Sequence, residues 1–194
     1  MKKIVFLFLI ANTIILSANN LYDSNKVYKI EIIFYDSDYK NILQQNYEDE
    51  IDLAAKLVFN DEIVLDSVGV RYKGNSSYNT KGEKKSFNVS IDAFRDEQRL
   101  LGYKTLNLNN AFVDPTFMGE AITSKIWKNY IPIMKTGYVY LYINGLEYGL
   151  YSNVQQINTD FLGEWFSSKK GNNYKGDPQG ELSWLGENKE LYKS

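Results

Sequence analysis

Strand-like alternation of apolar and polar side chains around tight turns is the feature that most limits what this chain can fold into. It is clearest in residues 137–154, where apolar side chains alternate with tyrosines up to the dipeptide Asn144-Gly145. Asn-Gly between two alternating runs is the strongest short-range signal for a β-hairpin. Further segments with strand or hairpin patterns are residues 27–35, 57–65, 68–73, 87–91 and 106–108. We therefore expect a mainly antiparallel sheet.

One segment has the pattern of a solid helix. Asp114 is a good N-cap, Pro115 is a good first helical residue, and apolar residues then recur at spacings of three and four up to Ile126. Pro132 is expected to end this helix, and a shorter helix is expected from Thr159. The predicted fold class is α+β, with an antiparallel sheet and one main helix.

The composition excludes several kinds of chemistry. The 194 residues include no His and no Cys, so Ser-His-Asp and Cys-His mechanisms, disulfides and the usual zinc sites are excluded. Any metal would have to be a hard cation on oxygen ligands, such as magnesium or calcium. The formal net charge is −2, so no global basic field indicates nucleic acid as a partner.

Residues 1–18 have the pattern of an export signal. Two lysines precede an apolar run over residues 4–16, and Ser17 and Ala18 are small residues that suit cleavage. An uncleaved anchor is the alternative, but the run is short and broken for a membrane span of about 20 residues. We predict a signal peptide, a secreted or cell-envelope protein, and no stable membrane span after removal of the signal.

Residues 68–77 place two cations beside a glycine-containing turn. Arg71 and Lys73 share one face of the expected strand. The turn that follows contains Ser76 and Ser77, and it can present backbone N–H groups and hydroxyls to an anion. Two cations beside such a turn would suit phosphate. A solvated strand face followed by an ordinary turn is the alternative, and the pattern alone favours it.

Two lysines and a glutamate are further candidates. If the next strand begins at Lys85, this side chain shares the core-facing parity of Phe87, and a Lys on the core side needs a partner or a ligand. If the strand begins at Ser86, Lys84 and Lys85 are both in solvent. Glu120 lies on the expected main helix, and a helix Glu paired with a strand Lys is typical of kinases, although a surface Glu is the favoured alternative.

Several segments together resemble the CotH kinase family of secreted atypical protein kinases, best known from spore coats. They are VGVRYKGNSS at 68–77, KKSFNV at 84–89, YKTLNLNNAFVDPTFM at 103–118, YVYLYINGLEYGLYSNVQQIN at 138–158 and GNNYKGD at 171–177. One such segment would be weak evidence, but their order and spacing also resemble those of the family. The resemblance implies an N-terminal lobe on an antiparallel sheet and a helical C-terminal lobe. ATP and Mg²⁺ or another divalent cation would bind between them, and phosphate would pass to Ser of a protein substrate.

The resemblance also implies which residues contact the nucleotide. They are Arg71, Lys73, Ser76, Ser77, Lys85 and Gln155. The first four match the phosphate-side motif of the family, and Lys85 matches the lysine that would engage phosphates. Gln155 lies in the stretch where the two lobes would join and adenine would sit. No metal ligand is assigned.

The chain also departs from the family pattern. Gly119 stands where the family usually has Arg, and Gln155 and Asn158 stand where it usually has acidic residues. The catalytic and metal-binding Asp residues of the family lie in the C-terminal lobe, which we expect this chain to lack. Residues 19–177 are thus expected to form the N-terminal lobe, and residues 178–194 a polar tail or the truncated start of the C-terminal lobe.

Two classes of function stay open, so the sequence does not decide whether the chain is an enzyme. The first is a CotH-like secreted protein kinase, truncated and inactive as given. The second is a secreted, non-catalytic binding or structural module derived from a kinase lobe, in effect a pseudokinase. A carbohydrate-binding face at Tyr138, Tyr140 and Tyr142 is a weaker third option, and a sheet face packed by the helix is the favoured explanation of these tyrosines.

Overall fold

The computed structural model describes residues 20–80, 82–171, 173–174, 176 and 183–192. It divides into two compact units, residues 1–156 and 157–194, which we describe separately. The predicted signal peptide and the predicted boundary at residue 177 lie outside the described residues and stay predictions. Within the described part of the chain, no helix is both long and apolar enough to cross a membrane.

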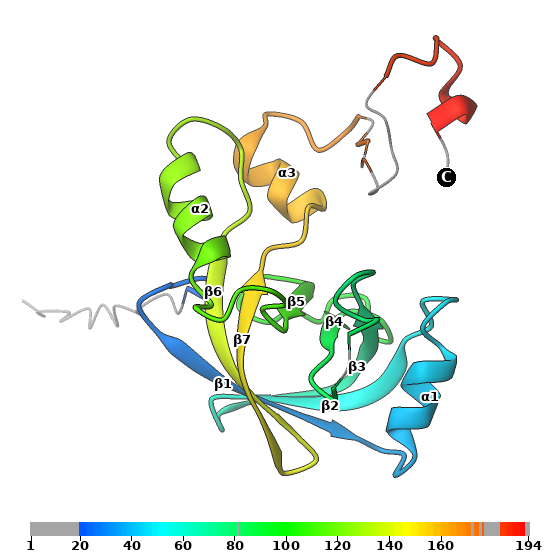
Figure 1. Ribbon diagram of the computed structural model, residues 1–194, viewed down its shortest axis with the longest axis vertical. Helices are drawn as coiled ribbons and strands as arrows, with labels where there is room; N and C mark the ends of the chain where they lie inside the picture. The colour runs from blue at the N-terminus through cyan, green and yellow to red at the C-terminus, as the bar shows by residue number, and fades with distance from the viewer. Residues whose placement is uncertain (1–19, 81, 172, 175, 177–182, 193–194) are drawn as a thin grey trace, which may run out of the picture. The chain divides into compact units, whose positions relative to one another are not determined.

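Seven strands of the first unit form a closed barrel (Figure 1). They are β1 (Val27–Phe34), β2 (Leu53–Phe59), β3 (Ile63–Lys73), β4 (Ser86–Ser90), β5 (Thr105–Asn109), β6 (Thr136–Ile143) and β7 (Leu146–Val154). The order around the barrel is β1-β2-β3-β4-β5-β7-β6. Neighbouring strands are antiparallel except β1 and β6, which run parallel, with Ile32 opposite Ile143.

The predicted fold class, a kinase-like α+β lobe with one main helix, is wrong. The described chain is a closed mixed barrel with three short α-helices, α1 (Tyr39–Gln45), α2 (Gly119–Trp127) and α3 (Thr159–Trp165). The physical reason is the parallel pairing of β1 with β6, because it joins strands that are distant in sequence and leaves no mark on the local pattern of either one. Closure by this pair turns the expected open sheet into a barrel.

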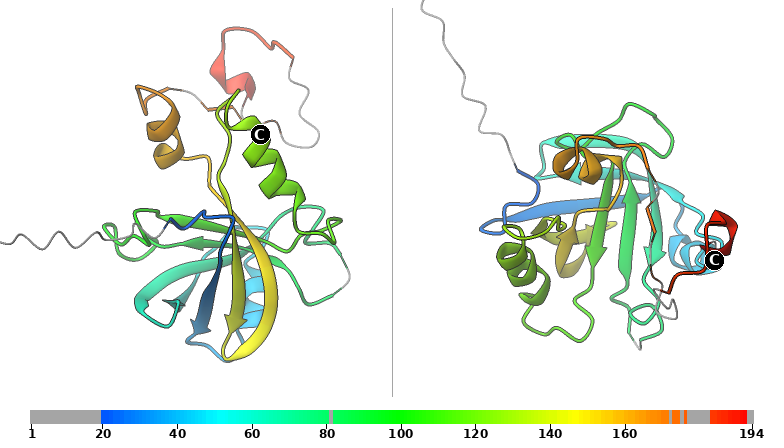
Figure 2. Two further views of the ribbon diagram at one scale, coloured as in Figure 1. Left: turned by 90° about the vertical axis from the view of Figure 1, so that its left-hand side faces the viewer. Right: turned by 90° about the horizontal axis from the view of Figure 1, so that it is seen from above.

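The predicted main helix exists but is shorter than expected. It begins at Gly119 and not at Pro115, because the Asp114 carboxylate accepts a hydrogen bond from the Gly119 backbone N–H at 2.8 Å across an intervening turn. It ends at Trp127, before Pro132. In the first unit, α1 and α2 lie on opposite sides of the barrel (Figure 2).

Both predicted hairpins are confirmed. Asn144 and Gly145 connect β6 to β7 with φ values of 48° and 77°, the left-handed conformations that a two-residue hairpin turn of this kind requires. Asn60 and Asp61 also have positive φ, at 51° and 58°, in the turn between β2 and β3. The Asn144 side chain also accepts a hydrogen bond from the Phe34 backbone N–H at 2.8 Å, which ties this turn to β1.

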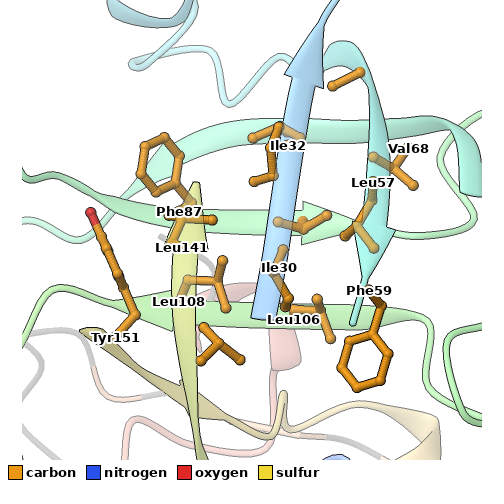
Figure 3. Close-up of a cluster of buried hydrophobic side chains, with 14 of the residues drawn as sticks. Ile30, Ile32, Leu57, Phe59, Val68, Phe87, Leu106, Leu108, Leu141 and Tyr151 are labelled. Atoms are coloured by element: carbon orange, nitrogen blue, oxygen red, sulfur yellow. The ribbon is translucent and has the colours of Figure 1, made fainter. Parts of the chain in front are cut away.

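The barrel interior is a single apolar core. The strands alternate as their sequences predict, so that β1 buries every second side chain. Figure 3 labels ten of the core residues: Ile30, Ile32, Leu57, Phe59, Val68, Phe87, Leu106, Leu108, Leu141 and Tyr151. Helix α1 adds Tyr39 and Leu43 to this core.

The second unit contains α3 and a short 3₁₀ helix, Lys189–Tyr192. The Asn158 side chain caps α3 by accepting hydrogen bonds from the backbone N–H groups of Asp160 and Phe161 at 2.9 and 3.3 Å. The helix predicted from Thr159 is therefore confirmed, with its cap one residue earlier.

Candidate functional site

The outward side chains at the end of β3 and along β4 and β5 are polar. We call Arg71, Lys73, Asn88, Asn107 and Asn109 the polar face. Arg71 lies opposite Asn88 across β3 and β4, and Asn88 lies opposite Asn107 across β4 and β5. Asn88 is only 7% exposed and Asn107 only 5% exposed. Polar groups this deeply buried need hydrogen-bond partners.

Lys73, at the end of β3, connects the polar face to helix α2. Its ammonium donates hydrogen bonds to Asn107 Oδ1 at 3.1 Å and to Asn109 Oδ1 at 3.2 Å. Asn109 Nδ2 in turn donates to Glu120 Oε1 in the first turn of α2 at 2.6 Å. The strand lysine and the helix glutamate are therefore linked through one amide side chain.

Asn107 is the centre of this network. Besides Lys73, its Oδ1 accepts a hydrogen bond from Asn88 Nδ2 at 3.1 Å. Its Nδ2 donates to Gln156 Oε1 at 2.7 Å and to the Val154 carbonyl at 3.2 Å. An amide side chain can accept and donate at once, so a single Asn joins β3, β4 and the end of β7.

Arg71 has a different environment from Lys73, although both lie on β3. Its guanidinium contacts Asp52 Oδ1 at 2.9 Å and Glu50 Oε2 at 3.2 Å. Both carboxylates come from the segment that leads into β2, so two negative charges compensate Arg71 within the protein. The two cations predicted to act together on phosphate are thus held by different partners.

The loop over residues 74–85 follows directly from Lys73. Gly74 has φ of +87°, and a Cβ at this position would lie 2.2 Å from Ser77 Oγ, so the turn requires glycine. Ser76 is exposed and Ser77 is half-buried. The Thr80 hydroxyl donates to the Ser77 carbonyl at 2.8 Å, which closes the turn.

Lys85 anchors this loop from within. Its ammonium donates to the backbone carbonyls of Tyr78 and Thr80 at 2.7 and 2.8 Å, and it lies 5.3 Å from the Tyr78 ring. The β4 strand begins at Ser86, and Lys85 is half-buried and not fully in solvent. Whether Lys85 also contacts a nucleotide stays a prediction.

Lys84, named with Lys85 as a candidate, is also half-buried and not fully in solvent. Its ammonium donates to the Leu150 carbonyl at 2.7 Å and lies 4.6 Å from the Phe117 ring and 4.8 Å from the Tyr151 ring. Burial lowers the pKa of Lys84. Lys84 therefore connects the 74–85 loop to β7 and to the segment between β5 and α2.

Gln155 lies at the end of β7 and is buried at 3% exposure. Its backbone N–H donates to the Lys135 carbonyl at 2.9 Å, and its Oε1 accepts from the Lys135 backbone N–H at 3.2 Å. Gln156, and not Gln155, is bonded to Asn107 on the polar face. Asn153, also near the end of β7, is fully buried. Neither Nδ2 nor Oδ1 of Asn153 has a hydrogen-bond partner among the described residues.

The polar face does not provide a metal site. Among the residues that the structure describes, no group of three or more acidic side chains is placed to hold a metal ion. Glu120 bonds to Asn109, and the carboxylates of Asp52 and Glu50 bond to Arg71. These residues do not fit a divalent cation, so we derive no step through one.

The sequence signal for the amides of the polar face was present but weak. Asn88 and Asn107 occupy the outward position between two apolar residues, in FNV and LNL. Strand alternation predicts that they point away from the core. It does not predict that they lie beside each other, because their register depends on how β4 pairs with β5.

Comparison with known proteins adds one finding. A family model described as "CotH kinase protein" matches residues 70–194, more than half of the chain. The matched span contains the whole polar face, the 74–85 loop and α2. Comparison with curated proteins gave no match.

Proposed function

Because the chain belongs to the CotH kinase protein family, we propose that its polar face binds the phosphates of ATP in a protein kinase reaction. The reaction class is phosphoryl transfer from ATP to a Ser side chain of a protein substrate. The observation that carries the proposal is a network within the matched span, in which Lys73 is bonded to Asn107 and Asn109 and Asn109 is bonded to Glu120.

This network suits the chemistry of the reaction. Phosphoryl transfer depends mainly on positioned cations and hydrogen-bond donors, and needs no His or Cys nucleophile. Lys73 supplies an ammonium whose direction is set by the amide oxygens of Asn107 and Asn109. Glu120 holds Asn109 in turn, so α2 sets the position of the lysine indirectly. A charge that is already positioned loses little entropy when it binds phosphate.

The 74–85 loop supplies the second half of the proposed phosphate site. It leaves the barrel one residue after Lys73, and the hydroxyls of Ser76 and Ser77 lie in its first turn. Turns of this kind present backbone N–H groups to anions. In this proposal Lys85 maintains the shape of the loop through the carbonyls of Tyr78 and Thr80.

In this proposal the described residues bind the nucleotide, and none of them acts as a catalytic carboxylate. ATP supplies the phosphoryl group, and the Lys73 ammonium neutralises part of the charge on its phosphates. In this proposal the adenine end lies toward Gln156, the residue after the predicted Gln155, because Gln156 is bonded to Asn107 of the polar face. The non-catalytic binding module is the outcome that remains if no nucleotide binds.

The test is a calorimetric titration of the full chain with ATP, with and without Mg²⁺. Lys73→Ala should weaken binding by roughly 10- to 100-fold, because a hydrogen bond to a charged group contributes about 1.5–3 kcal/mol. Lys56→Ala is the matched control, since Lys56 is an outward lysine on β2 whose contact is Asp66. Absence of ATP binding by the wild-type protein in both conditions would reject the proposed function.

We also propose that the protein is exported, on the pattern of residues 1–18. The check is N-terminal sequencing of the protein recovered from the culture medium of cells that express the full chain. A new N-terminus after Ala18 supports export. Retention of Met1 on protein found only inside the cells argues against it.

A further inference from the structure

The connection between β1 and β2 holds the 74–85 loop from outside. The Tyr47 hydroxyl donates to the Gly74 carbonyl at 2.8 Å. The Tyr47 ring stacks on the Tyr78 ring, with centroids 3.4 Å apart and planes 9° apart. Lys40 in α1 forms an ion pair with Glu83 at 2.6 Å. One short segment of the chain thus contacts both the beginning and the end of the loop.

The connection between β1 and β2 is itself anchored in the barrel core. Tyr39 of α1 is buried and stacks on Phe34 with centroids 4.6 Å apart, and its hydroxyl lies 3.2 Å from that of Tyr148 on β7. Leu43 is fully buried. Tyr47 follows α1 by two residues, so it extends from this anchored helix toward the loop, whose described residues form no helix or strand.

The contacts of Tyr47 lie at both ends of residues 74–78, the part of the loop that we propose binds phosphate. Gly74 is the residue after Lys73, so its carbonyl bond to Tyr47 fixes the point where β3 becomes the loop. Tyr78 is held on two sides, its ring by Tyr47 and its carbonyl by Lys85. The two serines of the loop lie between these fixed points.

We propose that Tyr47 is a positioning residue for the nucleotide site, which holds residues 74–78 in the conformation that receives phosphate. The ligand in this inference rests on the proposed function. The contacts of Tyr47 with Gly74 and Tyr78, which we call the clamp, form without a ligand. Tyr47 lies before residue 70, so the family match does not supply it. Tyr47 carries more of this role than Lys40, because the Lys40–Glu83 pair is exposed and such pairs contribute little.

The first experiment measures hydrogen exchange of the full chain without nucleotide. The amides of Tyr78 and Asn79 are bonded to the Asn75 carbonyl at 3.2 and 3.4 Å and report on the loop. Tyr47→Ala should raise their exchange rates by roughly tenfold or more. Tyr47→Phe keeps the ring and loses only the hydroxyl, so its effect should be smaller.

The matched control is Tyr35→Ala, since Tyr35 lies on the same connection and is 59% exposed. It should leave both amides unchanged. Melting temperatures of all variants separate a local effect from unfolding, and Tyr47→Phe provides the test if Tyr47→Ala does not fold. Unchanged exchange in both Tyr47 variants would overturn the clamp.

The second experiment measures ATP affinity. Tyr47→Ala should weaken ATP binding by roughly fivefold or more, and the effect should largely disappear in a Lys73→Ala background, because both residues act on one site. Faster exchange with unchanged affinity would overturn the positioning role and leave the proposed function intact. If the wild-type protein binds no ATP, the proposed function fails and the positioning role fails with it, while the exchange data still decide whether the clamp exists.

Discussion

Strands β3, β4 and β5 carry two rows of side chains with opposite character. Five residues of the inward row are apolar and at most 1% exposed: Val70, Phe87, Val89, Leu106 and Leu108. The outward row is the polar face, in which Asn88 and Asn107 are also buried but are joined by a hydrogen bond. Burial of the first row drives folding. Hydrogen bonds of the second row add little net stability, because they replace bonds to water. The comparison indicates that the inward row maintains the barrel and that the outward row contributes less to stability, which fits the nucleotide binding that we propose for it.

The largest expected effect tests the inward row. Leu106→Ala should lower the free energy of unfolding by about 2–5 kcal/mol, since it removes buried methyl groups and leaves a cavity in the core. Urea unfolding measures the change. ATP affinity without urea should stay unchanged, because Leu106 points away from the polar face. A loss below about 1 kcal/mol would mean that this row is not packed as described.

The next effect tests the outward row. Asn107→Ala should cost about 1–3 kcal/mol of unfolding free energy, because Lys73, Asn88 and Gln156 each lose a partner. The same urea unfolding measures it, with Asn109→Ala as the less buried comparison. If Asn107→Ala costs more than Leu106→Ala, the division between a stabilising row and a binding row is wrong.

A smaller effect concerns tyrosines that pack against the core. Burial raises the pKa of Tyr72 and of Tyr39 to about 12 each. In the unfolded chain these hydroxyls ionise near pH 10. The folded state therefore binds more protons above pH 10, and stability present below pH 10 is lost as pH rises toward 12. Two pKa units correspond to at most about 2.7 kcal/mol, and solvent screening of the partly exposed Tyr72 reduces this, so Tyr72→Phe should reduce the loss by about 1 kcal/mol in urea unfolding at a series of pH values. An unchanged pH dependence would contradict the burial of Tyr72.

The smallest effect is expected for an outward pair that is not buried. Lys56 and Asp66 lie 3.8 Å apart, with side chains 38% and 50% exposed. Lys56→Ala should change the free energy of unfolding by less than about 0.5 kcal/mol, and less still at high salt. Thermal melts at two salt concentrations measure it. A cost comparable to that of Asn107→Ala would remove the distinction between buried and exposed polar contacts.

Local sequence patterns predicted the elements well. The Asn144-Gly145 turn, the hairpin over residues 57–65 and the helix from Thr159 follow from side-chain chemistry that acts within a few residues. The inward row was predictable because alternation has a period of two. The start of α2 was misplaced because Asp114 caps Gly119 through an irregular turn, which the N-cap pattern does not describe.

Features that depend on distant contacts were not predictable in the same way. Barrel closure depends on the pairing of β1 with β6. The link between Lys73 and Glu120 depends on Asn109, whose position beside Lys73 follows from the register of β3, β4 and β5. The contact of Tyr47 with Gly74 joins segments on either side of two strands. The alternation of side chains along a strand predicts on which side of the strand a residue lies. The pairing of the strands and other tertiary contacts determine which residues it contacts there.

The parallel pair also has a consequence for how the protein is made. Strand β1 is paired on one side with β2, but its other side waits for β6, whose last residue is Ile143. A nascent chain that has not yet reached Ile143 therefore carries β1 as an open edge, which can pair with a neighbouring polypeptide. Such long-range closure slows folding relative to hairpin formation. Biogenesis of the protein is thus the stage at which it is most vulnerable to aggregation, and chaperones that cover strand edges should matter most there.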